Sequence, residues 1–204
     1  MSRNFLEAVA HRRSYYHLSD RALVSDSLVM GVVDELLTTM PSPFNVQSAR
    51  VVVLLGSEHR DLWQIVIDTL RNIVAAEHFE RSKHKIETSF LSGHGTLLFY
   101  EDEAALNRMR SSYPTYAENV GIWSEQSSGM LQFALWTALE DFGYGASLQH
   151  YNPLIDRAVS ERWGINSDWV LKAQMPFGAP IDTPSPRNSA NPPHNRRLTF
   201  GANE

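Results

Sequence analysis

Apolar positions recur every three to four residues in several parts of the chain, and this spacing is typical of one buried helix face. The helices that it predicts lie near 5–9, 25–39, 62–74 and 116–142. A polar stretch at 78–90 and the acidic and small residues from 101 onward are expected to be helical as well. Ser25 or Asp26 can cap the second helix, and Pro41 and Pro43 end it. Phe5, Leu6 and Val9 provide the apolar positions of the short opening helix.

Short apolar runs rich in β-branched or aromatic residues predict strands. These runs cover 50–55, 95–100, 146–149 and 169–175. Several prolines follow from Pro180, so the tail, about 180–204, is expected to be extended rather than helical. Strands that alternate with helices indicate an α+β or α/β domain with helices around one sheet. We expect a single domain over 1–204.

The expected helix at 116–142 is apolar on most of its circumference. Leu131, Leu135 and Leu139 mark one face, and Phe133 and Trp136 widen it. A helix of this kind is buried on most sides. A subunit interface would bury it, and a central core helix in a monomer is an almost equally good interpretation.

Charge and composition exclude several classes of protein. The formal net charge is −5 with both signs scattered, so no basic stripe for nucleic acid is present. The chain contains no cysteine, which excludes disulfides and thiol catalysis. The sequence shows no run long enough to span a bilayer and no secretory signal, so we expect a cytoplasmic protein without membrane contact.

The common catalytic and metal motifs are absent from the sequence. It contains no phosphate loop of the Gly-x-x-x-x-Gly-Lys-Ser/Thr type and no Gly-x-Gly-x-x-Gly before a helix. A Gly-x-Ser-x-Gly elbow is also absent. The eight histidines do not have metal-ligand spacing, so no metal site is expected.

Two polar stretches in the first quarter of the chain are candidates for binding. Arg12, Arg13 and Ser14 end the opening helix and can hold a phosphate through charge-assisted, forked hydrogen bonds. Taken alone, they are better explained as a solvated helix end. In the loop at 40–48, Asn45 and Gln47 would face the same way in extended backbone, where their amides suit a heterocycle edge. An ordinary Pro/Ser/Asn turn is the other interpretation.

Two further stretches lie in the second half of the chain. Gln149, His150 and Tyr151 follow a predicted strand, where polar groups are well placed to meet a ligand, although a strand-to-helix turn would look similar. Arg196 and Arg197 form a basic pair in the run at 195–198, which alone would be a solvated terminus.

In this order, the four stretches resemble the nitroreductase family of FMN proteins, and the resemblance covers nearly the whole chain. The most similar branch has short chains. Its motifs correspond to Gly-Thr-Leu-Leu-Phe-Tyr-Glu-Asp at 95–102, Gln-Ser-Ser-Gly-Met at 126–130, Gly-Ala-Ser-Leu-Gln-His-Tyr-Asn-Pro at 145–153 and Ala-Gln-Met-Pro-Phe-Gly at 173–178. The last two runs are the most specific.

The resemblance implies an α+β fold with a central, mainly antiparallel sheet flanked by helices. It also implies a domain-intertwined homodimer, with the long central helix at the interface and two FMN molecules between subunits. By similarity, Arg12, Arg13 and Ser14 would bind the FMN phosphate, and Arg197, or alternatively Arg196, would close on it from the tail.

The same resemblance assigns two other stretches to the flavin. Ser42, Pro43, Asn45 and Gln47 would line the flavin from the partner subunit. Gln149, His150 and Tyr151 would lie beside the ring, mainly through backbone groups.

The implied reaction is a ping-pong transfer in which NADH or NADPH reduces the flavin and a nitroaromatic or quinone-like acceptor reoxidises it. No catalytic side chain is required. Tyr16 stands where some family members have a lysine, and Gln149-His150 stands where some have an acid. His150 is therefore a possible modulator of the flavin. The alternatives are an FMN-binding redox sensor with little reductase activity and a flavin-free interaction domain.

Overall fold

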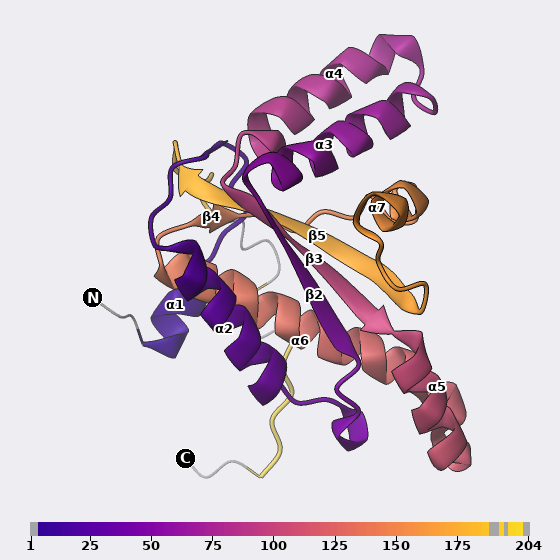
Figure 1. The fold of residues 1–204 in the computed structure, drawn as a ribbon. Helices are drawn as coiled ribbons and strands as arrows, with labels where there is room; N and C mark the ends of the chain where they lie inside the picture. The colour runs from indigo at the N-terminus through magenta and orange to yellow at the C-terminus, as the bar shows by residue number, and fades with distance from the viewer. Residues whose placement is uncertain (1–3, 188–191, 194–195, 202–204) are drawn as a thin grey trace.

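A computed structural model describes residues 4–187, 192–193 and 196–201 of the 204-residue chain. Here one sheet lies between two layers of helices (Figure 1). The helices are α1 (Phe5–His11), α2 (Asp26–Thr39), α3 (Gly56–Arg71), α4 (Ala76–Ile86), α5 (Glu103–Ser112), α6 (Val120–Asp141) and α7 (Asp156–Trp163). The strands are β1 (Leu18–Ser19), β2 (Ala49–Leu55), β3 (Gly95–Asp102), β4 (Gly145–Ala146) and β5 (Trp169–Pro180).

The sheet has the strand order β1-β5-β3-β2, and β4 also pairs with β5. All of these strand pairs are antiparallel, which confirms the expected mainly antiparallel α+β architecture. A bulge interrupts the pairing of β3 with β5, because Phe99 pairs with Ala173 whereas Tyr100 pairs with Leu171. Lys172 is therefore the extra residue, and a bulge of this kind redirects a side chain.

Side chains alternate between the two faces of β3 and so contribute to two separate cores. Leu98 and Tyr100 pack in the core beneath α3, α4 and α7. Leu97 and Phe99 pack in the core that includes α2 and α6. Figure 1 shows α3 and α4 on one side of the sheet and α2 and α6 on the other.

The long helix α6 confirms the predicted apolar face, because Leu131, Leu135 and Leu139 are buried. The α-helix begins at Val120 rather than near 116, and a 3₁₀ helix, Pro114–Asn119, precedes it. On its outer side, Met130 and Phe133 are 41% and 38% exposed. Burial of this side by a second subunit stays a prediction.

Several expected elements differ from the structure. A helix was expected from Glu101, but Glu101 and Asp102 complete β3, and Asp102 caps α5 through the amide of Ala105. The expected strand at 146–149 is shorter, since β4 covers two residues and Gln149 forms only an isolated bridge with Gln174.

The remaining differences concern elements too short or too exposed for periodicity to identify. Strand β1 and helix α7 were not expected, and α3 ends at Arg71, before the apolar positions at 73 and 74. The opening helix is present, but Phe5 and Leu6 are 70% and 74% exposed instead of buried. In the described part of the chain, every helix is too short or too polar to cross a membrane.

Candidate functional site

The Arg12–Ser14 stretch is positioned by α1 and by the segment around β4. The Arg12 amide donates to the Ala8 carbonyl at 2.9 Å and so ends α1. Ser14 forms an isolated parallel bridge with Ala146, and the Tyr15 amide donates to the Ala146 carbonyl at 3.0 Å. These bonds hold the backbone against the sheet and leave the side chains at 12–14 for other contacts.

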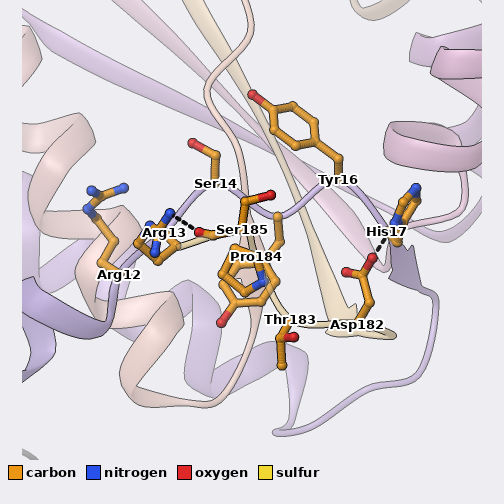
Figure 2. Close-up of a pocket in the computed structure, with 10 residues that line it drawn as sticks. Arg12, Arg13, Ser14, Tyr16, His17, Asp182, Thr183, Pro184 and Ser185 are labelled. Carbon is orange, nitrogen blue, oxygen red and sulfur yellow. Dashed lines mark hydrogen bonds and ion pairs between the residues drawn. The ribbon is translucent and has the colours of Figure 1, made fainter. Parts of the chain in front are cut away.

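A pocket of about 350 Å³ lies beside this stretch. Figure 2 shows residues 12–17 on one side and 182–185, from the segment after β5, on the other. The Arg13 guanidinium donates to the Ser185 carbonyl, and His17 pairs with Asp182. The segment that follows β5 therefore forms part of the pocket wall.

Three guanidinium groups gather at this end of the molecule. The Arg187 guanidinium donates to the carbonyl oxygens of Ala10 and Arg12 at 2.7 and 3.1 Å, which brings it beside Arg12 and Arg13. Among the described residues, none of these three arginines forms an ion pair with a carboxylate. The cluster therefore has uncompensated positive charge, which favours an anionic ligand.

Arg12 is the arginine of this cluster on which burial and charge repulsion have a clear effect. Burial, followed by the positive charges of Arg187 and Arg13, lowers its pKa from the usual arginine value. Its guanidinium lies 4.2 Å from the centroid of the Trp136 ring on α6. Its Nε is buried and has no hydrogen-bond partner in the described residues. A phosphate oxygen would supply both the missing acceptor and the missing negative charge.

The Ser42–Gln47 loop has a conformation that the sequence did not suggest. Asn45 and Gln47 were expected to face the same way in extended backbone, and this is wrong. Pro43–Asn45 forms a 3₁₀ turn, and Phe44, Asn45 and Gln47 have φ angles of +50°, +53° and +49°. Such left-handed backbone is uncommon outside glycine and persists only where the surroundings hold it.

Hydrogen bonds hold the loop in this shape. The Gln47 amide donates to Ser42 Oγ at 3.0 Å, across the turn. The Arg50 guanidinium donates to the Gln47 carbonyl at 2.8 Å and to Asp102 Oδ2 at 2.7 Å. The side chains of Asn45 and Gln47 stay exposed, so they are available to a ligand.

The stretch from Gln149 to Tyr151 is held by Gln174, a residue that the sequence reasoning did not assign. Gln149 exchanges two backbone hydrogen bonds with Gln174, at 2.7 and 2.9 Å. The buried Gln174 side chain accepts from the Tyr151 amide at 2.7 Å and donates to Asn152 Oδ1 at 3.1 Å. Its place in the specific run at 173–178 was the available signal.

The side chains of this stretch point to different environments. The Tyr151 ring packs against Trp63 and Phe90, and burial raises its pKa to about 12. Its partly buried side chain therefore packs against the core cluster beneath α3 and α4. His150 is exposed, and the described residues give its ring no hydrogen bond or ion pair.

The C-terminal basic pair is not among the described arginines that contact the Arg12 segment. Arg196 and Arg197 are exposed, and neither guanidinium has a hydrogen bond or ion pair with a described residue. The neighbouring Asn195 lies outside the described residues. Arg187 instead contacts the Arg12 segment, and sequence reasoning missed it because a single arginine among prolines has no distinctive pattern.

One chain does not bring the two ends of the proposed site together. Arg12 contacts Trp136 in the second half of α6, whereas Phe44 of the loop contacts Trp123 in the first half. At 1.5 Å per residue, these two tryptophans are separated by roughly 20 Å along the helix. Within the described ranges, no group of three His, Asp or Glu side chains is placed to hold a metal ion.

Comparisons with known proteins identify a family that this chain resembles over most of its length. The sequence model of the nitroreductase family matches residues 9–179. Nitroreductase FRM2 of Saccharomyces cerevisiae is 27% identical over 190 residues, which cover 92% of this chain and 94% of that protein.

Solved structures show the same similarity. Nitroreductase CinD from Lactococcus lactis, in complex with chloramphenicol, has a TM-score of 0.86 and 32% identity, covering 97% of this chain and 100% of that one. A nitroreductase with bound FMN from Desulfitobacterium hafniense has a TM-score of 0.70 and 17% identity, covering 99% and 100%, and shows the shared fold.

Proposed function

The chain belongs to the nitroreductase family, and from this premise we propose that it is an FMN-dependent oxidoreductase. It would use NADH or NADPH to reduce nitroaromatic or quinone-like acceptors. The observation that carries the proposal is the uncompensated cluster of Arg12, Arg13 and Arg187 beside Ser14. A cluster of this kind favours an anion, and the phosphate of FMN has the matching charge and oxygen geometry.

The residues at this end fit a phosphate well. The orphaned Nε of Arg12 is a buried donor without an acceptor, and a phosphate oxygen would satisfy it. Arg13 and Arg187 would supply forked donors, and the Ser14 hydroxyl a further one. Bonds from Arg187 to the carbonyls of Ala10 and Arg12 orient its guanidinium before a ligand arrives.

Bound FMN would supply hydride acceptance from NADH or NADPH and two-electron reduction of the acceptor, in a ping-pong order. The side chains of the protein would bind and orient the flavin. Backbone groups of Gln149 and His150 would lie by the ring, held by the buried Gln174, and His150 stays a possible modulator of its charge. Ser42, Pro43, Asn45 and Gln47 would line the ring from a second subunit.

A homodimer would bring together the arginines and the Ser42–Gln47 loop, which α6 keeps apart within one chain. Because the Arg12 end and the Ser42–Gln47 loop lie near opposite ends of this helix, two antiparallel copies would place one chain's arginines near the partner's loop. The exposed side of α6 supports this arrangement. It lines an apolar hollow of about 420 Å³ that includes Phe5, Met40, Met130 and Phe133. A second copy would cover this hollow.

The proposed class of electron acceptor is taken from the ligands bound in structures of similar proteins. CinD has been solved with chloramphenicol and with 4-nitrophenol, which both carry a nitroaromatic group, and also with nicotinic acid. FMN is bound in the D. hafniense structure and in a putative nitroreductase from Desulfovibrio desulfuricans. We extend both ligand classes to this chain as proposals.

The first test is the visible absorption spectrum of the purified protein, supplied with excess FMN and then dialysed. A flavin spectrum that survives dialysis and bleaches on anaerobic addition of NADH or NADPH is expected. A flavin that stays oxidised would favour a redox sensor over a reductase. A colourless protein would overturn the assignment of the arginine cluster to FMN.

A further inference from the structure

The acidic residue Glu101 is fully buried near the end of β3. Its side chain lies on the α6 side of β3, in line with Leu97 and Phe99, and is 0% exposed. An ionised carboxylate in such a place is costly unless it is well bonded. Its partners therefore indicate what it does.

Glu101 connects two elements that flank the Ser42–Gln47 loop. Its Oε2 accepts hydrogen bonds from Ser48 Oγ at 2.5 Å and from Ser124 Oγ at 2.9 Å. Ser48 directly follows the loop, and Ser124 directly follows Trp123, the α6 residue that contacts Phe44. A single carboxyl group thus ties both sides of the loop to the end of β3.

The charged groups around Glu101 come from two elements. Lys172, at the bulge of β5, and Glu125, on α6, lie close to it, and their own side chains form an ion pair at 2.6 Å. Burial raises the Glu101 pKa, while the hydroxyl bonds and Lys172 act in the opposite direction. Its second oxygen, Oε1, is buried and has no partner in the described residues.

From these contacts we infer that Glu101 is a positioning residue of the redox site, which holds the Ser42–Gln47 loop in its left-handed conformation by tying Ser48 to α6. The inference rests on the proposed function, because the loop matters for catalysis only if it lines the flavin. The tie itself is a property of the chain and can be measured without a cofactor.

The direct test is amide hydrogen–deuterium exchange of the flavin-free protein over residues 42–48. In Glu101→Ala we expect roughly tenfold faster exchange there, because the amides of Asn45, Val46 and Gln47 are bonded only within the turn. Glu101→Gln keeps an acceptor oxygen for both serine hydroxyls, so its exchange should stay within about twofold of wild type.

Two controls separate positioning from general destabilisation. Exchange in α3, on the other side of the sheet, should stay unchanged in all variants. Glu125→Gln, which removes an exposed carboxylate from the same region, should leave loop exchange unchanged. Unaltered loop exchange in Glu101→Ala, or equal acceleration in α3, would overturn the inference.

If Glu101→Ala does not fold, a milder substitution can test the same inference. Ser48→Ala removes one of the two hydroxyl ties, and we expect about threefold faster exchange in the loop. Unchanged loop exchange in a folded Ser48→Ala protein would also overturn the inference.

Kinetics of the FMN-loaded enzyme give a second readout. In Glu101→Ala the KM for a nitroaromatic acceptor should rise about tenfold while FMN stays bound, and Glu101→Gln should restore it to within about threefold. Equal impairment of both variants would show that the charge matters rather than the hydrogen-bonded tie, and would overturn the inference. If the wild-type protein binds no FMN, only the proposed function fails. The exchange experiment uses flavin-free protein and still tests whether Glu101 positions the loop.

Discussion

The two polar regions near the ends of α6 differ in whether their charged groups are bonded to partners within the chain. At one end, Arg12 and Arg13 line a pocket and Arg187 is bonded beside them, and among the described residues none of the three has a carboxylate partner. At the other, the Ser42–Gln47 loop is tied within the chain, through Arg50 and Asp102 at 2.7 Å and through Ser48. The first region retains unused hydrogen-bonding and charge capacity, whereas the second uses its capacity to maintain its own shape.

This difference separates binding from positioning. A region with uncompensated charge is stabilised by its ligand, so substitutions there should act on affinity. A region whose charged groups are mainly bonded within the chain gains little from a ligand's charge, so substitutions there should act on geometry. Variants on each side can test this division.

The largest effect is expected for Arg12→Ala. It removes the half-buried guanidinium that lies over Trp136, and charge-assisted bonds of this type contribute about 1.5–3 kcal/mol each. The Kd for FMN should rise roughly 10- to 100-fold, measured by flavin fluorescence titration at fixed salt. Arg81→Ala on α4, an exposed arginine without an ion pair, is the matched control. Equal losses in both variants would mean that only net charge matters.

An intermediate effect is expected for Arg187→Ala. This arginine is already bonded beside Arg12, so its loss should weaken FMN binding about tenfold in the same titration. Arg197→Ala tests the assignment made from the sequence. If Arg197→Ala costs more affinity than Arg187→Ala, the basic pair at the C-terminus supplies the main tail contact, and Arg187 is only a support.

The smallest effect is expected for Glu101→Gln, on stability. Burial raises the Glu101 pKa above its unfolded value of 4.5, so the penalty for ionising it in the folded state is absent below about pH 4.5. This ionisation penalty grows as pH rises through the pKa that Glu101 has in the folded state. Wild type should therefore lose stability relative to Glu101→Gln over this window, by a few degrees in Tm near neutral pH.

Thermal melts at several pH values measure this difference. A gap between wild type and Glu101→Gln that stays constant from acid to neutral pH would contradict the raised pKa. A loss of FMN affinity in Glu101→Gln as large as in Arg12→Ala would remove the distinction between the two regions.

Local patterns in the sequence were sufficient for most of the secondary structure. Ser25 caps α2 through the Leu28 amide, and the β-branched run at 50–55 lies within β2. Periodicity located α6, because a buried helix face repeats regardless of what it packs against. The end of β3 was misassigned because Glu101 looks like a surface residue, and only the serines that bond it explain its burial.

The candidate site was predictable as a set of stretches but not as a shape. The stretches at 12–14, 42–47 and 149–151 were identified from their polar residues. The left-handed backbone at Phe44 and Gln47 has no signal in residue types, because these residues usually avoid it, whereas Asn45 is of a type that tolerates it. Gln174 and Arg187 were missed because each acts on a segment far away in the chain.

The sequence by itself determined the family, the α+β order of elements, the apolar face of α6 and the polar stretches available for binding, because these depend on residue type and local spacing. Only the tertiary structure decided which polar groups are satisfied. It placed Arg187 beside Arg12, buried Glu101 between Ser48 and Ser124, and put the Arg12 cluster and the Ser42–Gln47 loop near opposite ends of one helix. Hydrogen-bond satisfaction and desolvation depend on distances between groups remote in the chain, and local spacing does not contain those distances.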